Sequence, residues 1–239
     1  MTTRIILIRH GESTANVAAS IAEATGRETI PVECRDADVP LSALGEQQAA
    51  TLSGRLREEL DGNIADASIW CSPYRRARRT AQLALGEDAF FAVDERLRDR
   101  ELGVLDALTA AGVERRLPDE AARRRWLGKF YYRPPGGEAW TDVALRIRSF
   151  VADVAAANSL PLVVFAHDAV VSLFLYVLSG WTEQQLDEFL LTRIVGNASL
   201  TVLVGNGHRW NIETFADESH LARAGVPSTS HPGAARVTE

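Results

Sequence analysis

Two short apolar runs, each followed at once by a histidine, constrain the fold of this sequence more than any other feature. Ile5 to Ile8 precede Arg9 and His10, and Leu162 to Ala166 precede His167. Such runs are too short for core helices and are typical of strands buried on both faces of a parallel sheet. The carboxyl ends of parallel strands lie along one edge, where open α/β sheets bind ligands. We therefore expect both histidines at that edge.

Helical and strand patterns alternate around these two runs. Ser42 is a candidate N-cap for a helix whose apolar stripe runs from Gly45 to Leu60, and Ser72 followed by Pro73 is a start signal for another helix. Residues 17–40 lack periodicity and predict a loop or a short broken helix. The alternation predicts an α/β fold with further strands at 67–71 and 90–93, further helices at 140–154, 169–178 and after Thr182, and a closing hairpin at 200–204 and 210–215.

A charged, irregular stretch from Leu105 to Arg133 interrupts the alternation. It predicts a helical insertion over the edge of the sheet, which can act as a lid above a ligand. A solvated helical face explains its basic side chains equally well, so both interpretations stay open. These side chains are Arg115, Arg116, Arg123, Arg124, Arg125, Lys129 and Arg133.

Length and composition limit the class of protein. We expect one domain over residues 1–223 of the 239, followed by a disordered tail over 224–239 that is rich in proline, serine and threonine. The formal net charge of −6 disfavours a nucleic-acid partner, because phosphodiester backbones require a basic surface. No apolar run approaches the roughly 18 residues of a membrane span.

Cysteine usage and the first residues indicate a compartment. Cys34 and Cys71 have no metal-ligand spacing and form no disulfide framework, and no secretion signal precedes the first strand. We therefore expect a cytoplasmic protein without a membrane or nucleic-acid partner. The sequence does not reveal its oligomeric state.

Basic side chains at the expected strand ends favour a small anion. Arg76 lies in the first turn after Ser72-Pro73, so Arg9, Arg76 and both histidines can converge. A divalent metal is the rival ligand of two histidines, but two guanidinium charges would repel it. The same charges suit a phosphoryl group, whose oxygens need positive charge in the transition state. A neutral imidazole can attack the phosphorus in line while a carboxylic acid protonates the leaving oxygen.

Five segments carry a resemblance to a known family. They are Arg9-His10-Gly11-Glu12 with Asn16, Leu41-Ser42-x-x-Gly45-x-x-Gln48-Ala49, Ser72-Pro73-x-x-Arg76-Ala77-x-x-Thr80-Ala81, Pro135-Gly136-Gly137-Glu138, and Val163-Val164-Phe165-Ala166-His167. In this order they resemble the motifs of the histidine phosphatase superfamily, also called the phosphoglycerate mutase-like family, and most closely its mutase and fructose-bisphosphatase type. The resemblance covers roughly residues 3–220.

The resemblance implies a fold and a set of roles. The fold is a three-layer α/β/α sandwich with a mostly parallel central sheet. The roles are His10 as the nucleophile, Arg9, Arg76 and His167 as phosphate ligands, and Asn16 as a further donor to the phosphate. The resemblance also implies a mechanism without a metal ion or another cofactor.

Two departures from the family pattern leave the proton donor open. The family usually has a glutamate four residues before a glycine, and this chain has Asp99 there, before Gly103. The aspartate is shorter, and Glu101 faces the same side of an extended loop, so Glu101 is an alternative donor. Asp168 follows the second histidine as in the acid phosphatase branch, and it is either a third candidate or the N-cap of the next helix. By register we favour Asp99.

These observations predict a phosphomonoester hydrolase that forms a phosphohistidine from a small anionic phosphate ester. Asn16, Glu101, Arg133 and Asp168 complete the expected substrate-binding set, with Arg133 contacting the part of the substrate remote from the phosphate. A phosphoglycerate mutase, which returns the phosphoryl group to its substrate, is the close alternative. A phosphate-binding protein without turnover is a second alternative, because the usual glutamate is absent at position 99.

Overall fold

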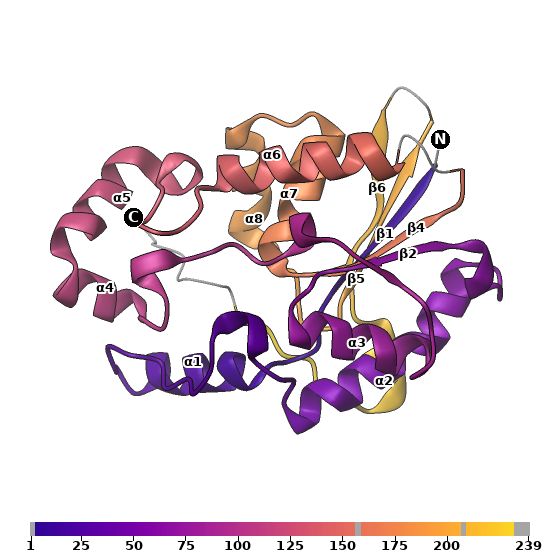
Figure 1. Cartoon of the computed structure of the whole chain (residues 1–239), viewed down its shortest axis with the longest axis horizontal. Helices are drawn as coiled ribbons and strands as arrows, with labels where there is room; N and C mark the ends of the chain where they lie inside the picture. Colours follow the sequence, from indigo (N-terminus) through magenta and orange to yellow (C-terminus); the bar gives the residue numbers. More distant parts are fainter. Residues whose placement is uncertain (1–2, 156–158, 207–208, 232–239) are drawn as a thin grey trace.

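The computed structural model describes residues 3–155, 159–206 and 209–231. Within these residues, six strands form one sheet in the order β3-β2-β4-β1-β5-β6 (Figure 1). The strands are β1 (Arg4–Arg9), β2 (Ser68–Cys71), β3 (Ala92–Val93), β4 (Leu162–Ala166), β5 (Leu200–Gly205) and β6 (Trp210–Asp217). The pairs β3/β2, β2/β4 and β4/β1 are parallel, whereas β1/β5 and β5/β6 are antiparallel. The predicted α/β fold and its closing hairpin are confirmed.

The two predicted apolar strands form the parallel pair at the centre of the sheet. Ile5 pairs with Leu162 and Arg9 pairs with Ala166, so β1 and β4 end at the same level. The backbone N–H of His10 continues the ladder and donates to the carbonyl of Ala166 at 3.0 Å. This register brings His10 next to His167 at the edge of the sheet, as the sequence predicts.

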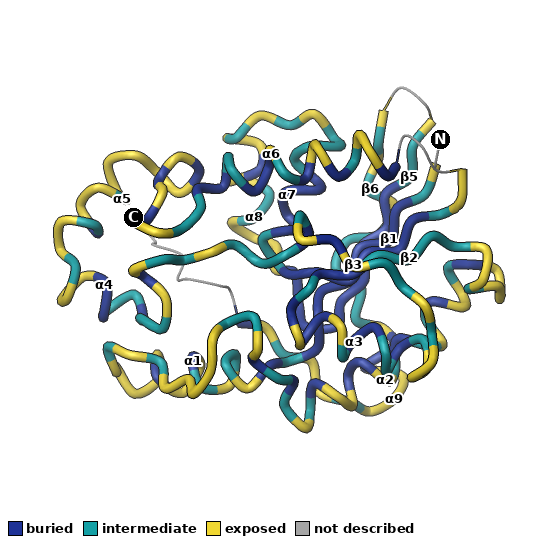
Figure 2. The backbone as a smooth tube through the Cα atoms, viewed as in Figure 1, coloured by how far each residue is buried: buried dark blue, intermediate teal, exposed yellow. Residues whose placement is uncertain are grey.

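Helices cover both faces of the sheet. On one face, α6 (Trp140–Phe150) and α7 (Asp168–Ser179) pack against Ile5 and Leu7. On the other face, α2 (Ala43–Glu59) and α3 (Arg75–Leu85) pack against Ile6 and Ile8. Successive strand side chains thus enter two separate apolar clusters, which makes the three-layer α/β/α arrangement whose buried centre Figure 2 shows in dark blue. The other helices are α1 (Thr14–Ala24), α4 (Ala110–Arg116), α5 (Pro118–Tyr131), α8 (Glu183–Thr192) and α9 (Ser219–Ala224).

The stretch from residue 105 to 133 is helical, as predicted, and contains α4 and α5. It has a small apolar cluster of its own, made by Leu105, Val113, Ala121 and Tyr132. Figure 1 shows the two helices projecting from one end of the sheet, across from α1. We call residues 105–133 the insertion. Its function as a lid stays a prediction.

Helix α1 begins where Ser13 to Asn16 indicate a helix start, but its residues 17–24 depart from the prediction of a loop or a short broken helix over 17–40. It runs unbroken from Thr14 to Ala24, and the side chains of Ser13 and Asn16 form a capping box at its start. Its buried residues are Ala19 and Ala22. Alanines give little hydrophobic contrast, which is why the helical period is hard to detect in the sequence.

The start of α3 also differs from its local sequence signal. The helix begins at Arg75 with Tyr74 as N-cap, three residues after Ser72, the predicted N-cap. The Oγ of Ser72 lies 2.8 Å from Nε2 of His167 and accepts a hydrogen bond from the backbone N–H of Tyr74. The contact with His167, directly after β4, assigns Ser72 to the site described below and accompanies its position outside the helix.

Part of the predicted disordered tail packs against the domain. The side chain of Gln48 donates to the carbonyl of Pro227 at 2.9 Å, and the backbone N–H of Asn197 donates to the carbonyl of Thr229 at 2.9 Å. Composition alone does not reveal these bonds, because the acceptors are backbone carbonyls that any residue carries. Residues 232–239 of the predicted tail lie outside the described residues.

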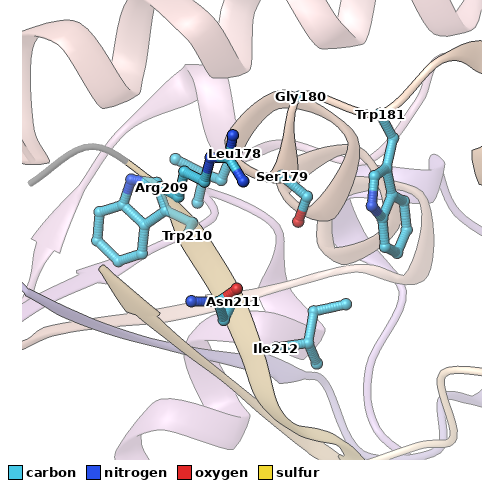
Figure 3. A pocket seen from close by; sticks show the side chains of 8 residues that line it. All are labelled: Leu178, Ser179, Gly180, Trp181, Arg209, Trp210, Asn211 and Ile212. Atoms are coloured by element: carbon cyan, nitrogen blue, oxygen red, sulfur yellow. The ribbon is translucent and has the colours of Figure 1, made fainter. Parts of the chain in front are cut away.

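The far end of the sheet carries a cavity of about 610 Å³ between the end of α7 and the start of β6 (Figure 3). Trp181 and Trp210 lie on opposite sides of it in this view. Gly205 of β5 pairs with Trp210, and its neighbour Val204 pairs with Arg4 at the start of β1. The cavity is therefore at the opposite end of the sheet from His10. Within the described ranges, no helix is long and apolar enough to cross a membrane.

Close backbone packing at Gly45 predicts a sharp effect of one methyl group. A Cβ at Gly45 would lie 1.9 Å from the carbonyl oxygen of Glu12, in the loop that follows His10. We expect Gly45→Ala to lower the free energy of unfolding by about 3 kcal/mol in urea denaturation, because neither backbone can yield. Gly54→Ala on the same helix is the control, since nothing lies within 4 Å of the added Cβ. It should raise stability by about 0.5–1 kcal/mol, and equal effects of the two changes would contradict the packing argument.

Candidate active site

His10 is buried, and its own loop orients it. The residue is 3% exposed, and Nδ1 lies 2.7 Å from the carbonyl oxygen of Gly11. We assign the ring proton to Nδ1, because a carbonyl only accepts. Nε2 then carries a lone pair, to which Nε of Arg76 donates at 3.2 Å. Burial, followed by the charges of Arg76, His167 and Arg9, lowers the pKa of His10 well below its usual value, so the ring is neutral near pH 7.

His167 lies against His10 at the end of β4. The ring centroids are 5.2 Å apart in an edge-on arrangement. Nε2 lies 2.8 Å from Oγ of Ser72, and Nδ1 lies 3.3 Å from Oδ2 of Asp99. Burial lowers the pKa of His167 against the opposing charge of Asp99. Ser72 thus orients the ring through Nε2, and the carboxylate of Asp99 lies beside Nδ1 as an ion-pair partner.

Arg9 is anchored by carbonyl groups from distant segments. Nη1 donates to the carbonyl of Val195 at 2.5 Å, and Nη2 donates to the carbonyl of His231 at 2.9 Å. Its Nε is buried and has no hydrogen-bond partner among the residues that the structure describes. A buried donor without an acceptor costs about 1–3 kcal/mol, so this N–H is available to an anion.

Arg76 is the most heavily bonded residue of the site. In addition to the bond to His10, Nη2 donates to Oδ2 of Asp99 at 3.0 Å. Nη1 donates to the backbone carbonyl of Asp36 at 2.5 Å and to its Oδ1 at 2.9 Å, and Nη2 donates to its Oδ2 at 3.1 Å. Burial alone would lower the pKa of Arg76, but the carboxylates of Asp36 and Asp99 raise it. Sequence reasoning missed Asp36, which lies in an irregular loop without a motif.

The three candidate proton donors have different environments. Burial would raise the pKa of Asp99, but His167 and Arg76 outweigh it and hold that pKa well below its usual value. Burial raises the pKa of Asp168. Asp168 is the first residue of α7, with His167 before it as N-cap, so the alternative of Asp168 as N-cap is wrong. Glu101 accepts a hydrogen bond at 2.6 Å from the hydroxyl of Tyr74, whose ring packs edge-on against His167.

Asn16 and Arg133 occupy very different places. Oδ1 of Asn16 accepts from the backbone N–H of Ser13 at 3.0 Å and from Nδ2 of Asn197 at 3.3 Å, which orients the amide. Arg133 forms an ion pair with Asp142, and its side chain is 62% exposed. Asp142 also accepts from the backbone N–H of Ala139 at the start of α6. The structure therefore places Arg133 in a surface ion pair at the start of α6.

A metal ion is the other ligand to consider for this cluster. Ligand atoms of His10, Asp99 and His167 all lie within 4.8 Å of one another. Arg76, however, contacts both His10 Nε2 and Asp99 Oδ2. A guanidinium at this distance opposes a cation and favours an anion, whose oxygens need donors. The arrangement fits a phosphate group better than a divalent metal.

Comparison with known proteins gives a family match over most of the chain. The family model of the histidine phosphatase superfamily (branch 1) matches residues 5–218. A 6-phosphofructo-2-kinase/fructose-2,6-bisphosphatase of Arabidopsis thaliana is 32% identical over 174 residues, which are 72% of this chain and 21% of that protein. A probable phosphoglycerate mutase of Salmonella paratyphi C is 29% identical over 230 residues, which are 91% of this chain and 94% of that protein.

A solved structure matches over nearly the whole fold. It is a mycobacterial glucosyl-3-phosphoglycerate phosphatase in complex with VO3, with 28% sequence identity and a TM-score of 0.70. The match covers 90% of this chain and 99% of that chain.

The lowered histidine pKa values predict how the protein responds to pH. Nitrogen–proton correlation spectra should show the proton of His10 on Nδ1 and a titration midpoint well below the ordinary value of about 6.5. Below about pH 6.5 the imidazole of His10 binds a proton in the unfolded chain but stays neutral in the folded protein. The free energy of unfolding should therefore fall as the pH drops below about 6.5. His10→Gln should assign the resonances and weaken this dependence. A midpoint of His10 at or above 6.5 would contradict the assigned neutral state.

Proposed function

Because the chain belongs to branch 1 of the histidine phosphatase superfamily, whose close relatives are phosphatases and mutases, we propose that it hydrolyses phosphomonoesters through a phosphohistidine on His10. One observation carries this proposal. His10 Nε2 keeps its lone pair at neutral pH and lies beside Arg76 and His167, where a phosphoryl group would find both a nucleophile and donors. The proposed reaction uses no metal ion.

The first half-reaction transfers the phosphoryl group to His10. Nε2 attacks the phosphorus in line, the bond to the ester oxygen breaks, and the leaving oxygen takes a proton from a carboxylic acid. Donors for the phosphoryl oxygens are Arg76, His167, Nε of Arg9 and the amide nitrogen of Asn16. In the second half-reaction the carboxylate accepts a proton from water, which attacks the phosphorus and releases inorganic phosphate and free His10.

We propose Asp99 as the proton donor. It contacts Arg76 and His167, which both lie against His10. These neighbours hold the pKa of Asp99 well below its usual value and keep it ionised near pH 7. A bound phosphate dianion takes over part of their positive charge and adds a negative charge beside the carboxyl, so the pKa of Asp99 rises when substrate binds. The carboxyl then becomes protonated where the leaving oxygen needs the proton.

The proposed substrate is a small ester that carries a second anionic group. Arg100, directly after Asp99, has its pKa lowered to about 10 by burial and by the charge of Arg124 in the insertion. Nζ of Lys129 lies 4.0 Å from the ring centre of Trp140, and burial lowers its pKa. These cations repel one another beside the site, and an anion bound among them would relieve that repulsion. We therefore propose that Arg100, Arg124 and Lys129, in place of Arg133, contact the second anionic group of the substrate.

A mutase is the second candidate. The mutase relative aligns over almost its whole length, and the covalent step on His10 is the same in both reactions. The two outcomes differ in whether water reaches the phosphohistidine before an acceptor alcohol does.

For the location we propose the cytoplasm, because Cys34 and Cys71 are both free thiols.

Trapping the intermediate tests the proposed function. Radiolabelled p-nitrophenyl phosphate, mixed with the protein in chelator and quenched in alkaline detergent, should leave label on the wild type that acid removes. His10→Gln should carry no label and should lower kcat by roughly 1000-fold or more. Release of labelled phosphate identifies a phosphatase, and transfer to an added phosphoglycerate identifies a mutase. Absence of both label and turnover would contradict the proposal.

Substitution of the three carboxyl groups tests the proton donor. Asp99→Asn should lower kcat for glycerol phosphate, a poor leaving group, by roughly 100-fold or more, and much less for p-nitrophenyl phosphate, whose leaving group needs little protonation. Glu101→Gln and Asp168→Asn are the matched controls and should affect both substrates alike. If either control shows the selective loss and Asp99→Asn does not, the donor assignment is wrong.

A further inference from the structure

Asp36 contacts both terminal nitrogens of the Arg76 guanidinium. It lies in the 3₁₀ turn Asp36–Asp38, between α1 and α2. Its two carboxylate oxygens accept from Nη1 and Nη2 at 2.9 and 3.1 Å. This bridging geometry is the one by which arginine also binds two oxygens of a phosphate. A carboxylate of the chain thus occupies the face of Arg76 that a phosphate would use.

No N–H of Arg76 is left for a ligand while Asp36 is in place. A guanidinium has five donors. Asp36 receives three of them, His10 receives one, and Asp99 receives one. A phosphate that binds to Arg76 must therefore displace an acceptor.

The position of Asp36 makes it the acceptor that can leave. Its side chain is 36% exposed, and the turn that carries it has no side-chain cap. Asp99, by contrast, also contacts His167 from inside the site. Residues 31–35, directly before Asp36, are all exposed, and exposed irregular segments are among the less stable parts of a fold.

The same segment is bonded to the insertion. The backbone N–H of Ile30 donates to the carbonyl of Ala107 at 2.8 Å, and that of Thr109 donates to the carbonyl of Glu28 at 3.1 Å. The insertion is thus anchored on the segment that leads to Asp36, so a displacement of the insertion would act on that segment.

We propose that the carboxylate of Asp36 is an internal competitor for the phosphate at Arg76 and determines which anions the site accepts. This inference rests on the proposed function, in which Arg76 binds the phosphoryl oxygens. A ligand carboxylate carries the same single negative charge as the Asp36 carboxylate that it would displace, so it has no electrostatic advantage at Arg76. A phosphate dianion carries one more negative charge, so the competition selects dianionic esters. After hydrolysis Asp36 returns to Arg76 and helps to expel inorganic phosphate.

The neighbouring aspartate provides a matched control for the test. Asp38 lies in the same turn but pairs with Arg35 at 2.8 Å on the surface. Asp36→Asn and Asp38→Asn therefore remove the same charge from the same element, and only the first contact involves Arg76. Inhibition constants of inorganic phosphate and orthovanadate are measured against p-nitrophenyl phosphate, and phosphate binding is measured directly by calorimetry.

Asp36→Asn should bind both anions more tightly than the wild type by roughly 10- to 100-fold, the range of a lost hydrogen bond to a charged group. Asp38→Asn should stay within about twofold of the wild type, as expected for an exposed ion pair. Asp36→Ala is a second variant, and thermal unfolding confirms that each variant is folded.

Two results would overturn the inference. Equal inhibition constants for Asp36→Asn and Asp38→Asn would show that Asp36 does not compete, and weaker inhibition of Asp36→Asn would show that it positions Arg76 for the phosphate. Failure of the proposed function would give a different result. The wild type would then bind no phosphate, or would bind it no more tightly than the Arg76→Ala variant does.

Discussion

The hydrogen-bonded pairing of β1 with β4 is the constraint on which the rest of the site depends. Both strands are buried on both faces, so a shift of one residue would exchange their side chains between the two apolar clusters. The register is therefore fixed by the whole core. It places His10 and His167 with ring centres 5.2 Å apart, and Ser72, at the end of the neighbouring strand β2, reaches His167. The precision of the site derives from the interior of the sheet, while its chemistry lies at the edge.

The parts predicted from the sequence are those with a strong local signal. The apolar runs before His10 and His167 identify two strands and their ends, and the stripe from Gly45 to Leu60 identifies α2. Two of the misjudged parts depend on distant contacts. Ser72 has a good start signal for a helix, but its bond to His167 moves the start to Arg75. Asp36 carries no signal at all, because its role depends on how the loop folds back onto Arg76.

The electrostatics of the site follow from the cost of burying charge. Arg9 and Arg76 are both buried, and an unpaired buried charge is expensive. Asp36 and Asp99 offset the charge of Arg76, and Asp168 and Asp99 offset that of Arg9. Binding of an anion at Arg76 is therefore an exchange of partners. Because Arg76 is shared between His10, Asp36 and Asp99, a change at any of them alters the others.

The insertion has its own apolar cluster, and near its end Phe130 packs in the core cluster that covers one face of the sheet. For protein engineering, the insertion can be treated as one unit, a cassette. Residues 27–30 belong to this cassette, since Thr109 Oγ1 donates to the carbonyl of Arg27 at 2.6 Å and a Cβ at Gly112 would lie 1.9 Å from the carbonyl of Glu28. A graft from a relative would thus need to transfer both stretches together, because either half alone would face a backbone surface of the wrong shape.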